Sequence, residues 1–103
     1  MDVIAERRLE LRVGGTTVEV LVKLGRPEPS REDWHCPYEI WFGNSSRNMA
    51  MHGIDAMQAL QLSIATLDVE LEHGAKKRGG SLYHYDEPFT SMLENSGLQV
   101  RHP

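Results

Sequence analysis

The sequence contains a single cysteine, and no stretch of it is both long and apolar. One cysteine cannot form an intramolecular disulfide, so Cys36 indicates a reducing compartment. The apolar runs are too short to span a bilayer, and the N-terminus lacks an apolar segment behind a basic start. These absences predict a cytoplasmic protein that has no membrane partner.

An excess of basic charge is also absent, since the formal net charge is −4. Aromatic residues make up only 7% of the chain, and they are not interleaved with basic residues as they are on nucleic-acid surfaces. Lys76, Lys77 and Arg78 form a short basic run directly after an acidic stretch, where they offset its charge. We therefore expect no nucleic-acid partner.

Motifs for catalysis and for metal binding are missing too. The five histidines and the cysteine lack the paired, short spacing of a metal site, and no Gly-x-Ser-x-Gly motif occurs. This predicts a protein that is not an enzyme and that needs no cofactor or metal. The alternative is a small-ligand-binding or enzymatic domain in which residues 25–34 and 83–89 meet. Its polar groups would be His35, His84 and Asp86.

The most strongly patterned stretch covers residues 53–74 and predicts one long helix with both ends marked. Asp55 is placed as the N-cap, and Gln58 three residues later completes a capping box. Gly74 is placed just after the last turn, where a left-handed backbone ends a helix. The predicted helix therefore runs from Asp55 to Gly74.

This helix has two apolar faces. One is a stripe at spacings of three and four residues, which predicts packing on a core: Met57, Leu60, Ile64, Leu67 and Leu71. Leu62 and Val69 fall on the opposite side at about 100° per residue. If the first face covers a sheet, the second meets another layer of the chain or a partner.

Alternation of apolar and charged residues predicts the sheet. Two alternating runs, residues 3–13 and 16–24, flank Gly14-Gly15, which is a two-residue hairpin signal. Closing the hairpin there places Leu11 opposite Val18, so the apolar side chains of both strands share one face. The same register places Glu10 opposite Glu19, a repulsion that nearby arginines relieve.

A third strand through Tyr38, Ile40 and Phe42 and a fourth over residues 47–52 extend this sheet. The fourth strand is expected to bring Met49 and Met51 beside Ile40 and Tyr38. Residues 82–85 indicate a short further strand.

Pro88 marks the start of a short terminal helix that ends near Gly97. The predicted fold class is α+β, a single two-layer domain over residues 1–103. A four-stranded antiparallel meander is covered by one long helix, followed by a short C-terminal strand and helix. Residues 99–103 are expected to be a frayed tail.

The run Gly53-x-Asp55-x-x-Gln58-Ala59-Leu60 follows the meander and precedes a glycine-rich segment with Tyr85-Asp86-Glu87-Pro88-Phe89. Together they resemble a group of small uncharacterised bacterial domains, some of which look like immunity proteins of contact-dependent or polymorphic toxin systems. The resemblance covers most of the chain, from the first hairpin to Phe89. It implies the α+β fold, a bacterial origin and protein binding, and it implies no catalytic residue.

Apolar residues outside the predicted core indicate an interface. The sheet face opposite the helix keeps Ile4, Leu21 and Trp41. Either the segment containing Tyr83 and Tyr85 folds back over this face with the terminal helix, or the face contacts a second copy or another protein.

We therefore predict a non-enzymatic protein-binding module, either a homodimer or an immunity-type binder of another protein. Its apolar contacts would be Leu21 and Trp41 on the sheet and Leu62 and Val69 on the helix. The predicted contacts for a basic partner are Asp68 and Glu72.

Overall fold

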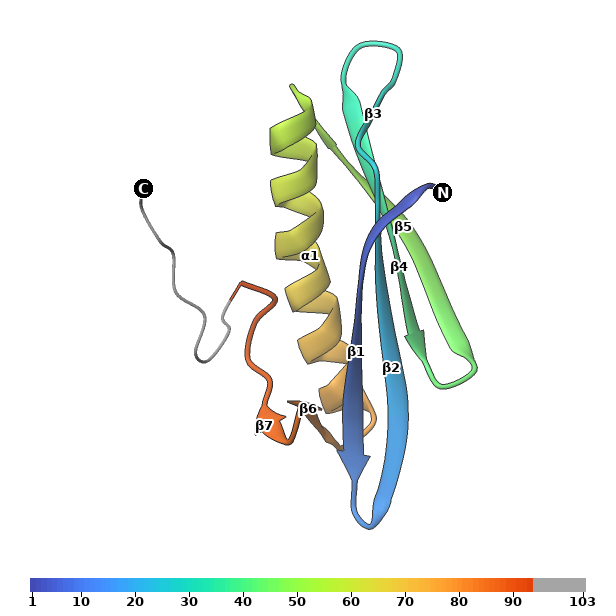
Figure 1. The fold of residues 1–103 in the computed structure, drawn as a ribbon, viewed down its shortest axis with the longest axis vertical. Coiled ribbons are helices and arrows are strands. Elements are labelled where there is room, and N and C mark those ends of the chain that lie inside the picture. Colours follow the sequence, from blue (N-terminus) through green and yellow to red (C-terminus); the bar gives the residue numbers. More distant parts are fainter. Residues whose placement is uncertain (94–103) are drawn as a thin grey trace.

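The computed structural model describes residues 1–93, in which one helix lies on one face of an antiparallel sheet (Figure 1). The elements in chain order are β1 (Val3–Val13), β2 (Thr16–Gly25), β3 (Glu28–Pro29), β4 (Trp34–Phe42), β5 (Ser45–Gly53), α1 (Ala56–Lys77), β6 (Ser81–His84) and β7 (Glu87–Pro88). The order across the sheet is β5-β4-β2-β1-β6-β7, and β3 pairs with the first residues of β4. The α+β prediction is confirmed, but the sheet has seven strands rather than four.

The first hairpin has the predicted register. Leu11 lies opposite Val18, and Glu10 lies opposite Glu19. Gly14 has a φ of 57°, which the first position of a type II′ turn requires. Arg8 forms an ion pair with Glu19, so an arginine does relieve the repulsion between the two facing glutamates.

The second hairpin differs from the prediction by two residues. Its turn consists of Gly43 and Asn44 alone, because Phe42 already pairs with Ser45. Met49 therefore lies opposite Tyr38 and not beside Ile40. The expected pairing was wrong because it assigned four residues to a turn that needs two.

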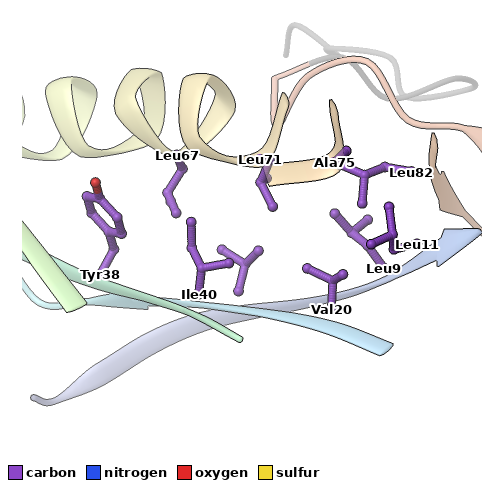
Figure 2. Packing of buried hydrophobic residues seen from close by; sticks show 10 residues of the cluster. Leu9, Leu11, Val20, Tyr38, Ile40, Leu67, Leu71, Ala75 and Leu82 are labelled. Atoms are coloured by element: carbon purple, nitrogen blue, oxygen red, sulfur yellow. The ribbon is translucent and has the colours of Figure 1, made fainter. Parts of the chain in front are cut away.

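The core lies between α1 and the sheet, as Figure 2 shows. Its buried members are Leu9, Leu11, Val20, Val22, Tyr38, Ile40, Leu67, Leu71, Ala75 and Leu82. The predicted inner face of the sheet is thus confirmed. The predicted helix stripe needs one correction, because Met57 is 63% exposed. The helix instead turns the small residues Ala59 and Ser63 toward the sheet, and both are fully buried.

The N-terminal end of α1 is the predicted one. The Asp55 carboxylate accepts the Gln58 backbone N–H at 2.7 Å. The Gln58 side chain reaches back to the N–H of Ile54 at 2.8 Å, one residue before the expected partner. Two backbone donors at the helix start are therefore satisfied by this pair of side chains.

The C-terminal end was assigned to the wrong glycine. α1 continues to Lys77 with Arg78 as its C-cap, and Gly79 has the left-handed φ of 71°. The N–H groups of Gly79 and Gly80 donate to Lys76 and Ala75, each at 3.0 Å, as in a Schellman motif. Gly74 is instead buried within the helix, where an added Cβ would lie 2.5 Å from the Phe42 ring.

After α1 the chain returns to the sheet, because β6 pairs with residues 10–12 of β1. Tyr85 and Asp86 form a tight turn with positive φ values of 49° and 63°, and β7 follows. The predicted terminal helix is wrong within the described residues, since Pro88 lies in β7 and residues 89–93 are not helical. The remainder of that helix and the predicted frayed tail lie outside the described residues.

Residues 89–93, called here the C-terminal segment, pack alongside α1 (Figure 1). Asp68 of α1 accepts the Met92 N–H at 2.6 Å and the Ser91 hydroxyl at 2.8 Å. Phe89 and Met92 contact the core. Contacts to a helix and a core already in place explain why this stretch is not helical.

Candidate functional site

On the sheet face that points away from α1, the turn at Tyr85 and Asp86 reaches Arg12, and no helix or strand among residues 1–93 covers Leu21 and Trp41. The C-terminal segment lies on the α1 side, so it does not fold back over this face. Leu21 alternates with the buried Val20 and Val22 and therefore belongs to the uncovered face. Trp41 lies directly opposite Leu21 on the neighbouring strand. Both side chains are half-buried by their neighbours on the sheet.

Charged residues of both signs surround this apolar pair. The indole N–H of Trp41 donates to Glu39, and Glu39 lies opposite Lys23. On the β1 side, Arg8 pairs with Glu19. An apolar centre within a mixed-charge rim is typical of protein interfaces, whereas a polyanion would need a surplus of cations.

The other half of this face is built around Arg12. Its guanidinium lies 4.0 Å from the centre of the Tyr83 ring and 2.5 Å from the carboxylate of Asp86. The hydrogen bond to Asp86 raises the pKa of Arg12. A shallow groove of about 990 Å³ runs along β1 here, and the turn after β6 forms its far wall.

The outer face of α1 carries the two predicted apolar residues. Leu62 is 38% exposed and Val69 is 66% exposed, so both are accessible. Val69 lines a groove together with Phe42 and Arg47, beside the β4–β5 hairpin. The two predicted acidic contacts already have partners within the chain. Asp68 holds the C-terminal segment, and Glu72 pairs with Lys76 at 2.9 Å, which lowers the pKa of Glu72.

The polar residues of the alternative, ligand-binding hypothesis do not come together. His35 lies on β4, where its ring is 6.0 Å from that of His52. His84 lies on β6 and Asp86 in the following turn, and β2 and β1 separate them from β4. Asp86 is also engaged by Arg12. No group of three metal-ligating side chains occurs in the described part of the chain.

Cys36 is fully buried and forms no disulfide. Its thiol contacts the Gly25 carbonyl at 3.4 Å, and burial raises the pKa of the thiol. A raised pKa disfavours the thiolate that nucleophilic chemistry needs. This cysteine therefore packs as a small apolar residue beneath α1, whose Ser63 donates to the Cys36 carbonyl at 2.6 Å.

The family of the chain follows from a match over nearly all of this fold. A family model described as a domain of unknown function (DUF6968) covers residues 5–92. The chain belongs to this family. The expectation of an uncharacterised domain is thereby confirmed. No curated protein and no solved structure matches the chain.

One feature of this DUF6968 domain escaped the sequence reasoning, namely the edges of its sheet. β5 pairs only with β4, so its outer edge has no strand partner within residues 1–93. β1 pairs with β6 only over residues 10–12, which leaves its first half as a second free edge. The order of the strands decides which edges are free. The alternation of apolar and charged residues along one strand does not indicate that order. No described helix has the length and apolar character to cross a membrane.

Proposed function

We propose that this DUF6968 domain is a non-enzymatic protein-binding module of the bacterial cytoplasm, of the immunity type, that binds another protein through the uncovered sheet face. The observation that carries the proposal is the Leu21–Trp41 pair at the centre of that face. Large aromatic and aliphatic side chains inside a polar rim dominate the binding energy of protein interfaces. Nothing in residues 1–93 covers them.

The chemistry of the remaining residues supports a binding role over catalysis. His35 is separated from His84 by two strands, and the Cys36 thiol is buried. An enzyme needs its nucleophile, base and orienting group within hydrogen-bond reach of one another. Ser30, Asp33 and His52 are linked by hydrogen bonds, but Asp33 lies between the other two. Among residues 1–93 no hydrogen bond joins the His52 ring to the Ser30 hydroxyl, so this group lacks the contact between base and nucleophile.

Affinity capture from a lysate of the source organism tests this proposal with three baits: the wild type, Leu21→Glu and Leu62→Glu. We expect the wild type and Leu62→Glu to retain the same partner and Leu21→Glu to lose it. Circular dichroism confirms that each bait is folded. A partner retained equally by Leu21→Glu would exclude the sheet face, and no partner with any bait would refute the binding function itself.

A further inference from the structure

The strands at the borders of the sheet differ in how they avoid pairing with another chain. Exposed edges are normally blunted by short length, proline, charged residues or a β-bulge, because free N–H and C=O groups recruit other strands. β3 and β7 are two residues long, and each contains a proline. Neither therefore offers a template for a further strand.

The free half of β1 is protected as well. A register shift between Val3 and Ala5 interrupts its pairing with β2. Glu6, Arg7 and Arg8 follow, and the Arg7 guanidinium donates to the Met92 carbonyl at 3.3 Å, so a side chain crosses this edge. Charge and irregularity both disfavour strand addition at this place.

β5 has none of these devices. It is nine residues long, it contains no proline, and its register with β4 is unbroken from Gly53 to Ser45. Arg47 is its one residue with a permanent charge, and that charge is engaged by Glu70 of the same chain's helix. β5 is therefore a long, regular, nearly neutral edge.

The free hydrogen-bonding groups of β5 follow from the hairpin. A two-residue turn makes Phe42 and Ser45 a mutually hydrogen-bonded pair, so every second residue after Ser45 directs its N–H and C=O outward. These residues are Ser46, Asn48, Ala50 and His52. No backbone hydrogen bond outside the ladders engages them in the described structure.

We propose that β5 is a homodimerisation edge, on which the β5 strand of a second copy pairs in antiparallel orientation about a two-fold axis at Met49. This register places Asn48 opposite Ala50 of the second copy and Ser46 opposite its His52. All four outward residues are then paired, which gives about eight hydrogen bonds. An isologous contact of this kind closes after two subunits.

The side chains suit a second copy of the same strand. Arg47 faces Met51 of the second copy, so like charges do not meet. Met49 faces its own counterpart on the α1 side, and Met49 is 39% exposed in the single chain. Pairing the two methionines across the axis would remove this apolar surface from water. The strand of a different protein would have to present charged and apolar side chains at matching positions. The β5 strand of a second copy does so by symmetry.

Light scattering with a matched pair of variants tests the proposal. The wild type is expected at twice the chain mass of 11.7 kDa at micromolar concentration. Asn48→Pro should be monomeric, because proline removes an outward N–H without removing a bond to β4. Asn48→Ala keeps that N–H and should remain dimeric. Circular dichroism of both variants confirms that they are folded.

A cross-link identifies the edge independently, also in the event that Asn48→Pro fails to fold. In Met49→Cys the two thiols would face each other across a closely spaced strand pair, so mild oxidation should yield a covalent dimer. Met57→Cys, at an exposed site on α1, should yield none. A monomeric wild type, or a dimer without the Met49→Cys cross-link, would overturn the proposal.

Partner binding by the sheet face and dimerisation through β5 are tested by different variants, so one proposal can fail while the other holds. Leu21→Glu should abolish partner capture and leave the dimer mass unchanged, whereas Asn48→Pro should lower the mass and leave capture by the sheet face. Leu62→Glu should alter neither, because Leu62 belongs to neither surface. Loss of the dimer in Leu62→Glu would place the self-association on α1 instead.

Discussion

At the scale of single residues, Tyr38 connects three elements of the fold. Its hydroxyl on β4 donates to Glu70 of α1, and Glu70 forms an ion pair with Arg47 of β5. The Glu70 side chain is only 17% exposed. Burial raises the pKa of Tyr38, and the hydrogen bond to Glu70 raises it further, so the hydroxyl stays protonated.

We expect Tyr38→Phe to lower the free energy of unfolding by about 1–3 kcal/mol, because it removes a hydrogen bond to a charged, largely buried acceptor. Urea unfolding of the wild type and the variant measures the difference. Tyr83→Phe, whose hydroxyl makes no such bond in the described structure, is the control. Equal midpoints for Tyr38→Phe and the wild type would show that the bond to Glu70 contributes nothing.

The surroundings of His84 predict that the stability of the fold depends on pH. Burial lowers the pKa of its imidazole below the ordinary value of 6.5, and the charge of Arg7 lowers it further. A histidine with a lowered pKa binds its proton more readily in the unfolded chain. Its contribution to stability is therefore present above pH 6.5 and is lost as the pH falls toward the lowered pKa.

An NMR titration of the folded protein should accordingly give His84 a midpoint below 6.5. The variant His84→Gln should lose less stability than the wild type when the pH is lowered through this range. A midpoint at or above 6.5 would contradict the proposed effect of burial. Replacing Arg7 by Met should raise the midpoint, which separates the effect of the charge from that of burial.

At the scale of elements, Gly74 provides space for the Phe42 ring against α1. Ala is normally preferred over Gly inside a helix by about 1 kcal/mol. Here the added methyl group would lie 2.5 Å from the ring, and Arg78 stacks on the same ring at 4.1 Å. We expect Gly74→Ala to destabilise the protein by about 1–3 kcal/mol through overpacking.

A double-mutant cycle with Phe42→Leu tests this contact. In the Phe42→Leu background the methyl group has room, so Gly74→Ala should become neutral or stabilising. Chemical denaturation of the four proteins gives the coupling energy. The same cost in both backgrounds would mean that Gly74 has a role unrelated to Phe42.

The ends of the helices and strands show which boundaries can be predicted from neighbouring residues alone. Asp55 and the Gly14-Gly15 turn were predictable because the chemistry that defines them is local. Gly74 and Gly79 are both suitable helix ends by sequence. The choice between them depends on Phe42, a residue far away in the chain that needs the space at Gly74. The prediction of a terminal helix failed for a similar reason, because residues 89–93 contact Asp68 and the core in an irregular conformation.

At the scale of the whole molecule, Asp68 joins the C-terminal segment to the rest of the fold. We expect Asp68→Ala to release Ser91 and Met92, because the carboxylate accepts a hydrogen bond from each. Amide hydrogen exchange should then speed up over residues 89–93 and remain slow in β2 and β4. Glu72→Ala, which removes an exposed carboxylate one turn away, should leave the segment protected. Unchanged exchange in Asp68→Ala would show that the remaining contacts, namely apolar packing and the hydrogen bonds of Met92 with Arg7 and of Phe89 with Leu82, suffice to hold the segment.

The arrangement of layers was predictable from the sequence, and the arrangement of strands within the sheet was not. Period-two alternation identified both faces of the sheet, so the accessible sides of Leu21 and Trp41 followed from it. The separation of His35 from His84 depends on β1 and β2 lying between their strands. That order arises from pairing between distant segments, and no local pattern encodes it. The free edge of β5 was missed for the same reason.

The pairing of β6 with β1 has a consequence for the time course of synthesis. Leu82 completes a ladder on Leu11, a residue made much earlier. At about 5–20 residues per second, roughly 4–14 seconds separate the two on a translating ribosome, whereas a hairpin such as β1–β2 forms within about 10 microseconds. Stalled chains that end before and after β6 should therefore differ in the protease resistance of β1. Until the four residues of β6 are synthesised, the β1 edge of the nascent hairpin has no strand partner.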